Sequence, residues 1–211
     1  VYPYYPGKAN LLGGDVDLVP VDEDGGADVA AFREAADEDT ALILVNSPNN
    51  PTGRVYDPET VRGLVEVAEE YDALLVADEV YDHFDYTGRF ESALTIDSPR
   101  RIVTSAFSKS MAITGFRVGY AVLPERLLSH ARTRHMLVNV TGSRPAQAAV
   151  LAALRETGPG YYAHNRELLR DRVATFTDAL DEIGAEYTTP EGGFYVLARF
   201  DDLPGTTANA E

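Results

Sequence analysis

Three short runs rich in apolar residues, at positions 41–45, 73–77 and 101–105, alternate with longer polar stretches in the first half of the chain. The first two runs contain no polar residue, which is typical of strands buried on both faces. The first run ends in a stretch of turn-forming residues over 46–53, and the second ends at Asp78 and Glu79. The pattern therefore predicts three buried strands of a parallel sheet.

Elsewhere in the chain, apolar residues recur at helical spacing. Asp28 and Asp57 stand where helix N-caps are expected, and Pro58 follows as a first-turn proline. The spacing predicts helices over 28–37, 58–71, 125–138, 145–156 and 160–183, and further strands over 15–21, 116–123 and 194–198. Strands that alternate with helices indicate an α/β domain with a largely parallel sheet flanked by helices.

Polar residues suited to ligand binding follow each of the three buried strands. Asn50, Asp78 and Lys109 lie at or just beyond the predicted strand ends. Ligands of open α/β sheets bind outside the carboxyl ends of the strands. We therefore expect these three side chains to meet in one crevice.

Composition excludes several classes of function. The chain has 211 residues, a formal charge of −16 and an estimated pI of 4.5, which argues against nucleic-acid binding. It has no apolar run long enough to cross a membrane and no basic, apolar leader at Val1, so neither a membrane span nor a secretory signal is expected. It has no cysteine, and its four histidines show no metal-ligand spacing. We therefore expect a cytoplasmic protein without a metal site.

Lysine is scarce in this acidic chain. Only Lys8 and Lys109 are present, and the other 16 basic residues are arginines. An acidic, lysine-poor composition resembles that of haloarchaeal proteins, and it predicts that folding needs salt to screen self-repulsion. A lysine kept in such a chain points to chemistry that arginine cannot perform, because lysine can lose its proton and form an imine with an aldehyde.

Residues 105–120 place Lys109 between small residues, with Arg117 eight positions later and a glycine-flanked apolar run beyond it. This segment resembles the lysine signature of class I/II aminotransferases, the fold-type I enzymes that use pyridoxal 5′-phosphate (PLP). The resemblance implies that Lys109 holds PLP as a Schiff base and later moves the substrate proton, and that Arg117 binds the phosphate. The family usually has serine or glycine where this chain has Ala106, so Ser108 or Ser105 is expected to contact the phosphate instead.

The resemblance extends to other residues of the expected site. Asp78 would keep the pyridine nitrogen protonated, and Asn50 and Tyr81 would donate hydrogen bonds to the phenolic oxygen. Asn50 begins a loop that resembles the family's Asn-Pro-Thr-Gly loop, in which the Asn–Pro bond is expected to be cis. Tyr2 lies where the family usually has an aromatic ring stacked on the cofactor.

The resemblance implies a PLP-transferase large domain over residues 1–185 and the start of a small C-terminal domain over 186–211, introduced by Glu191-Gly192-Gly193-Phe194-Tyr195. A homodimer that moves an amino group between an amino acid and a 2-oxo acid is expected. The family's upstream phosphate loop and C-terminal carboxylate-binding arginine have no counterpart here, so the chain is interpreted as a central fragment that binds PLP poorly by itself. A C–S lyase or a decarboxylase of the same fold, a ligand-sensing domain of a transcription regulator, and a non-functional relic are the alternatives.

Overall fold

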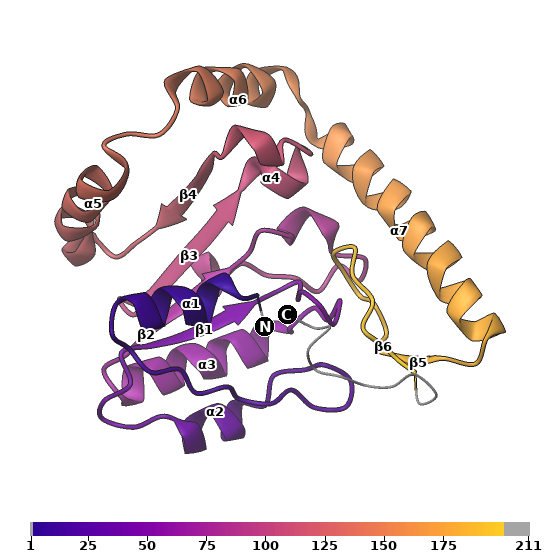
Figure 1. Ribbon diagram of the computed structural model, residues 1–211, viewed down its shortest axis with the longest axis horizontal. Coiled ribbons are helices and arrows are strands. Elements are labelled where there is room, and N and C mark those ends of the chain that lie inside the picture. Colours follow the sequence, from indigo (N-terminus) through magenta and orange to yellow (C-terminus); the bar gives the residue numbers. More distant parts are fainter. Residues whose placement is uncertain (1, 201–211) are drawn as a thin grey trace.

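A four-stranded sheet forms the centre of the molecule in the computed structural model, which describes residues 2–200 (Figure 1). Its strands are β1 (Leu42–Asn46), β2 (Leu74–Asp78), β3 (Arg101–Ala106) and β4 (Gly119–Val122), in the order β1-β2-β3-β4. The first three strands are parallel, and β4 runs antiparallel to β3. The sheet is thus mostly parallel, as predicted.

Helix α3 (Pro58–Glu70) covers β1 and β2, and α2 (Val29–Ala35) packs on α3. Asp57 caps α3 by accepting a hydrogen bond from the Thr60 amide at 2.8 Å, and Pro58 occupies the first turn. Apolar residues at helical spacing form the buried face of α3, namely Val61, Leu64, Val65, Val67 and Ala68. Full burial of one leucine such as Leu64 contributes about 1.5–3 kcal/mol, so this layer fixes the position of β1 and β2.

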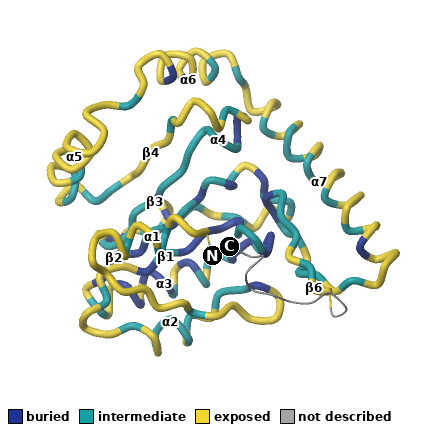
Figure 2. Tube along the Cα trace, viewed as in Figure 1, coloured by how far each residue is buried: buried dark blue, intermediate teal, exposed yellow. Residues whose placement is uncertain are grey.

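The remaining elements surround this core. They are α1 (Tyr4–Leu11), the 3₁₀ turns η1 (Asp82–Phe84), η2 (Ala93–Thr95) and η3 (Thr114–Phe116), α4 (Phe107–Ser110), α5 (Glu125–Asn139), α6 (Arg144–Glu156), α7 (Pro159–Glu182), β5 (Glu186–Tyr187) and β6 (Ala198–Arg199). Buried residues concentrate around β1, β2 and α3, whereas β4, α5 and α6 are mostly exposed (Figure 2). Within residues 2–200, no helix is both long and apolar enough to span a membrane.

Most predicted elements are confirmed within two residues at each end, including the three strands and the helices now labelled α2, α3, α5, α6 and α7. The prediction that the strands are buried on both faces is wrong, because burial alternates along β1 and β2, Leu42 is exposed, and Val103 alone is buried in β3. The strand predicted over 15–21 is wrong. Its apolar residues Val16, Leu18 and Val21 are exposed, and no strand among the described residues pairs with it. Alternating polarity alone cannot form a strand without a partner edge.

Two other predicted strands are shorter than expected. In the segment 116–123, the chain first forms η3 and a left-handed residue, Arg117, and only then pairs with β3. In the segment 194–198, only Ala198 is in a strand, and the preceding Phe194 and Tyr195 pack their rings on Tyr81. The small second sheet, formed by β5 and β6, lies within residues 186–199, and residues 201–211 of the predicted second domain lie outside the described part.

Candidate active site

The carboxyl ends of β1 and β2 bring Asn46 and Asp78 side by side in register. The Asn46 amide donates to the Asp78 carbonyl at 2.8 Å, and its own side-chain oxygen accepts the Asn50 amide at 2.8 Å. The loop that carries Asn50 contains cis bonds at Ser47–Pro48 and Asn50–Pro51, the second of which was expected. Asn46 therefore ties the Asn50 loop to the strand end that carries Asp78.

Asp78 is only partly exposed, and its carboxylate has two hydrogen-bond donors. The Tyr5 hydroxyl donates to Oδ2, and the Val80 amide donates to Oδ1 at 3.2 Å. Burial raises the pKa of the Asp78 carboxyl, while both hydrogen bonds act in the opposite direction by favouring the ionised form. A cation placed here would be favoured, because it would neutralise a carboxylate whose ionisation is costly.

Tyr81 lies near both Lys109 and Asn50. Its ring is buried, and the Lys109 Nζ lies 5.9 Å from the ring centroid. Burial raises the pKa of the Tyr81 hydroxyl, as does its hydrogen bond to the Tyr195 hydroxyl, whereas the Asn50 side chain lowers it. Asn50, Tyr81 and Lys109 are thus gathered beside the strand end that carries Asp78.

Lys109 lies in α4, directly after β3, and its amine faces aromatic rings. Besides Tyr81, Phe194 places its ring centroid 5.5 Å from Nζ. Phe194 and Tyr195 stack on each other with their ring centroids 4.9 Å apart, and both contact the Tyr81 ring edge to face. The amine therefore has an aromatic wall on one side.

The other residues of the predicted site lie outside these contacts. Arg117 is exposed, has a left-handed backbone with φ of 55°, and donates from its guanidinium to the Thr114 carbonyl at 2.7 Å. It lines a cavity of about 620 Å³ between η3 and the α5–α6 connection, and Lys109 does not line that cavity. The Ser108 carbonyl accepts a hydrogen bond from the Thr114 hydroxyl at 2.9 Å. The exposed ring of Tyr2 packs on Tyr4 and Tyr5.

The sequence analysis missed Tyr5 and gave Phe194 and Tyr195 no place at the lysine. Tyr5 is three positions from Tyr2, a spacing that places both on one side of a helical turn, and this was the available signal. The hydroxyl of Ser105 donates to the Glu79 carbonyl at 3.4 Å, so it is turned toward the end of β2.

The donor set fits PLP. An aldehyde needs an amine, a pyridine nitrogen needs an anion, a phenolic oxygen needs donors and a flat ring needs an aromatic neighbour. Lys109 has an amine and Asp78 a carboxylate that could meet the first two needs, and the Tyr81 hydroxyl and Asn50 amide near them could act as donors. Arg117 lines a cavity that Lys109 does not line. The contacts described above therefore bring together the groups for the amine, the pyridine nitrogen and the phenolic oxygen, but not the group for the phosphate.

Comparison with known proteins places these residues in a family. The family described as aminotransferase class I and II matches residues 1–210. A probable aspartate/prephenate aminotransferase of Thermus aquaticus is 36% identical over 197 residues, which is 92% of this chain and 51% of that protein. A probable aspartate aminotransferase of Methanocaldococcus jannaschii is 33% identical over 87% of this chain and 50% of that protein.

Solved structures agree with the sequence relatives. An aspartate aminotransferase of Thermotoga maritima superposes with a TM-score of 0.88 at 30% identity, over 95% of this chain and 54% of that one. A double mutant of the Thermus thermophilus aspartate aminotransferase gives 0.89 at 32% identity, over 93% and 53%. The chain spans about half the length of the curated relatives it matches. With nearly every residue matched, the chain belongs to the class I and II aminotransferases.

Proposed function

We propose that this protein is a PLP-dependent aminotransferase and that the chain carries the lysine side of its active site. The main observation behind this proposal is that Lys109, Tyr81 and Asn50 lie near one another beside Asp78, at the carboxyl ends of parallel strands. Family membership supports the same reaction, because relatives that share this segment are named as aminotransferases. Among enzymes of this fold, the names of these relatives favour amino-group transfer over C–S cleavage or decarboxylation.

Each residue then has a defined task. PLP, when bound, withdraws electrons from the substrate Cα. Lys109 would bind the cofactor through its amine and, once the substrate amine has displaced it, would move the proton from the substrate Cα to C4′ of the cofactor. Asp78 holds a proton on the pyridine nitrogen by charge pairing, which is favourable because a counter-charge relieves its buried carboxylate.

The remaining tasks are binding and orientation. Tyr81 and Asn50 would donate hydrogen bonds to the phenolic oxygen, and Tyr2 would supply the aromatic ring that packs on the cofactor. Arg117 binds the phosphate through its forked guanidinium, with Ser108 as a second donor. One Arg117 nitrogen, Nη1, donates to the Thr114 carbonyl, and the other N–H groups of the guanidinium are the donors proposed for the phosphate.

The substrates in this proposal are an amino acid and a 2-oxo acid, and aspartate is the first donor to test because the relatives' names include it. The proposal includes a homodimer in the cytoplasm that works at high salt. It also includes a large domain over residues 1–185 followed by a small domain from 186. Exposed apolar side chains on α5 and α6, such as Leu137, Val138 and Leu151, offer surface for a second chain.

The test uses the fact that the chain has two lysines. The protein is incubated with PLP and reduced with borohydride, and the modified lysine is found by peptide mapping. We expect the label on Lys109, with Lys8 as the internal control, and we expect loss of that label in Lys109→Arg. Equal labelling of both lysines would overturn the proposal. The full-length protein, supplied with aspartate and a 2-oxo acid, should then conserve the amino group, whereas a lyase would release ammonia.

A further inference from the structure

The segment from Glu191 to Tyr195 packs closely on loops that follow strands of the four-stranded sheet. The backbone amides of Glu191 and Gly192 both donate to the Gly53 carbonyl at 2.8 Å, and the Gly193 amide donates to the Phe84 carbonyl at 2.9 Å. A Cβ on Gly192 would lie 2.8 Å from that same Phe84 carbonyl, so only glycine permits this approach. The contact joins residues that are more than 100 positions apart in the chain.

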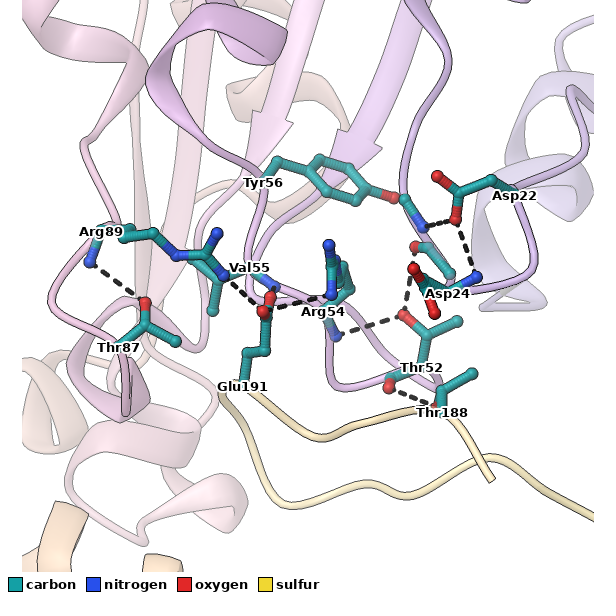
Figure 3. A network of polar contacts seen from close by, with 12 residues as sticks. Asp22, Asp24, Thr52, Arg54, Val55, Tyr56, Thr87, Arg89, Thr188 and Glu191 are labelled. Carbon is teal, nitrogen blue, oxygen red and sulfur yellow. Dashed lines mark hydrogen bonds and ion pairs between the residues drawn. The ribbon is translucent and has the colours of Figure 1, made fainter. Parts of the chain in front are cut away.

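The Glu191 carboxylate is the charged centre of this contact (Figure 3). It accepts from the Arg54 guanidinium at 3.2 Å, from the Val55 amide at 3.2 Å and from the Arg89 guanidinium. The Glu191 side chain is 13% exposed, against 27% for Arg54 and 45% for Arg89. Partial burial protects the pairing from solvent screening better than a surface ion pair.

The aromatic wall of Lys109 begins three residues after this carboxylate. Phe194 lies 5.5 Å from the Lys109 amine, and Tyr195 receives the Tyr81 hydroxyl at 3.2 Å. Gly192 and Gly193 separate Glu191 from Phe194, and Gly193 has φ of +69°. Glycines are the most conformationally free residues, so the position of the rings depends on contacts that fix this link, which are the backbone hydrogen bonds of Gly192 and Gly193 and the side-chain pairing of Glu191.

We propose that Glu191 is a positioning residue for the active site: by pairing with Arg54 and Arg89, it holds Phe194 and Tyr195 against Lys109 and Tyr81. Arg54 follows directly on the loop that carries Asn50, so one carboxylate ties the aromatic wall to the cofactor loop. Loss of the pairing leaves the segment held by the backbone hydrogen bonds of Glu191, Gly192 and Gly193 alone, so the rings move away from Lys109 more often and the amine becomes more accessible. The proposal rests on the proposed function for the role of Lys109 as the reactive amine.

Access to the Lys109 amine can be measured without a cofactor. The whole chain is treated with trinitrobenzenesulfonate, which modifies amines, and the rates at Lys109 and Lys8 are read separately by peptide mapping. Lys8 is exposed on α1 and reports changes in reagent or pH. Because the reagent is not an aldehyde, failure of PLP to bind leaves this measurement intact and distinguishes the two proposals.

In Glu191→Gln, we expect the Lys109 rate relative to Lys8 to rise about three- to tenfold, because two partly screened ion pairs are lost. Arg89→Gln should give a smaller rise in the same direction. The matched control is Glu186→Gln, which removes one exposed carboxylate on nearby β5. It should leave the ratio unchanged.

Far-UV circular dichroism establishes that each variant is folded, and if Glu191→Gln does not fold, Arg89→Gln decides the test. A ratio in the folded Glu191 or Arg89 variant equal to that of Glu186→Gln would overturn the proposal. In the full-length protein, Glu191→Gln should lower the rate of reduction-trapped PLP labelling at Lys109 and leave labelling at Lys8 unaltered. Glu191→Asp should restore part of that rate, because it keeps the charge.

Discussion

Removing one hydroxyl from Tyr5 tests how the protein holds the Asp78 carboxylate. The Tyr5 hydroxyl donates to Asp78 Oδ2 across 73 positions of sequence, and within residues 2–200 the other donor to that side chain is the Val80 amide at 3.2 Å. Tyr5→Phe keeps the aromatic ring and its edge-to-face contact with Tyr2. The substitution therefore isolates the hydrogen bond.

The magnitude depends on the charge of Asp78. A hydrogen bond to an ionised group is worth about 1.5–3 kcal/mol, and one between neutral groups about 0.5–1.5 kcal/mol. Burial raises the pKa of Asp78, so the ionised fraction of its carboxyl is smaller at about pH 4 than at about pH 8. We expect Tyr5→Phe to cost about 1.5–3 kcal/mol of unfolding free energy at about pH 8 and roughly 1 kcal/mol less at about pH 4.

Urea unfolding followed by far-UV circular dichroism at both pH values, at one fixed salt concentration, measures this difference. Tyr4→Phe is the matched control, because Tyr4 is on the same helix, is 62% exposed and makes a ring contact with Tyr2 that phenylalanine retains. Its cost should stay within about 0.5 kcal/mol at both pH values. An equal loss in the two variants, or a Tyr5→Phe loss that does not depend on pH, would refute the reasoning.

Three further predictions concern the stability of the folded chain. Leu64→Ala should cost about 2–5 kcal/mol in urea unfolding because Leu64 is fully buried, whereas exposed Leu11→Ala should change stability by less than about 0.5 kcal/mol. Burial raises the pKa of three neighbouring carboxyls, Asp78, Glu79 and Asp82. The folded state therefore binds protons more tightly than the unfolded chain, so the thermal midpoint should fall as pH rises through these raised values, and Glu79→Gln should flatten that fall. Raising salt from about 0.1 to about 1 M shortens the screening length from about 10 to about 3 Å, so the midpoint should rise for a chain with a charge of −16; no change would mean that self-repulsion is not limiting.

The sequence predicted the sheet well because its central strands carry local signals. The runs over 41–45 and 73–77 are short and wholly apolar, which is typical of strands that contribute to a core, and Asp57 with Pro58 marks the start of α3 without reference to the rest of the fold. The same parallel arrangement places the strand ends together, so the gathering of Asn50 and Lys109 beside Asp78 followed from the predicted topology.

The features that the sequence did not predict depend on distant contacts. The hydrogen bond from Tyr5 to Asp78 and the position of Tyr195 against Tyr81 join residues 73 and 114 positions apart. The segment 15–21 has the polarity of a strand, but a strand also needs a partner edge, which local polarity does not report. Arg117 adopts a left-handed backbone, a state that non-glycine residues seldom occupy and that its neighbours do not signal.

The residues proposed for the pyridine ring and the residue proposed for the phosphate differ in how firmly the core holds them. Asp78 ends β2 and Asn50 follows β1. Both strands have buried residues, namely Ile43, Val45 and Leu75, so the core sets the positions of Asp78 and Asn50 before any ligand binds. Arg117 lies beyond this core, exposed and hydrogen-bonded to a nearby carbonyl. Electrostatic groups are most effective when they are fixed in advance, because no free energy is then spent on orienting them. The pyridine side of the proposed site is therefore prepared by the core of this chain, whereas Arg117 on the phosphate side is held only by a local hydrogen bond.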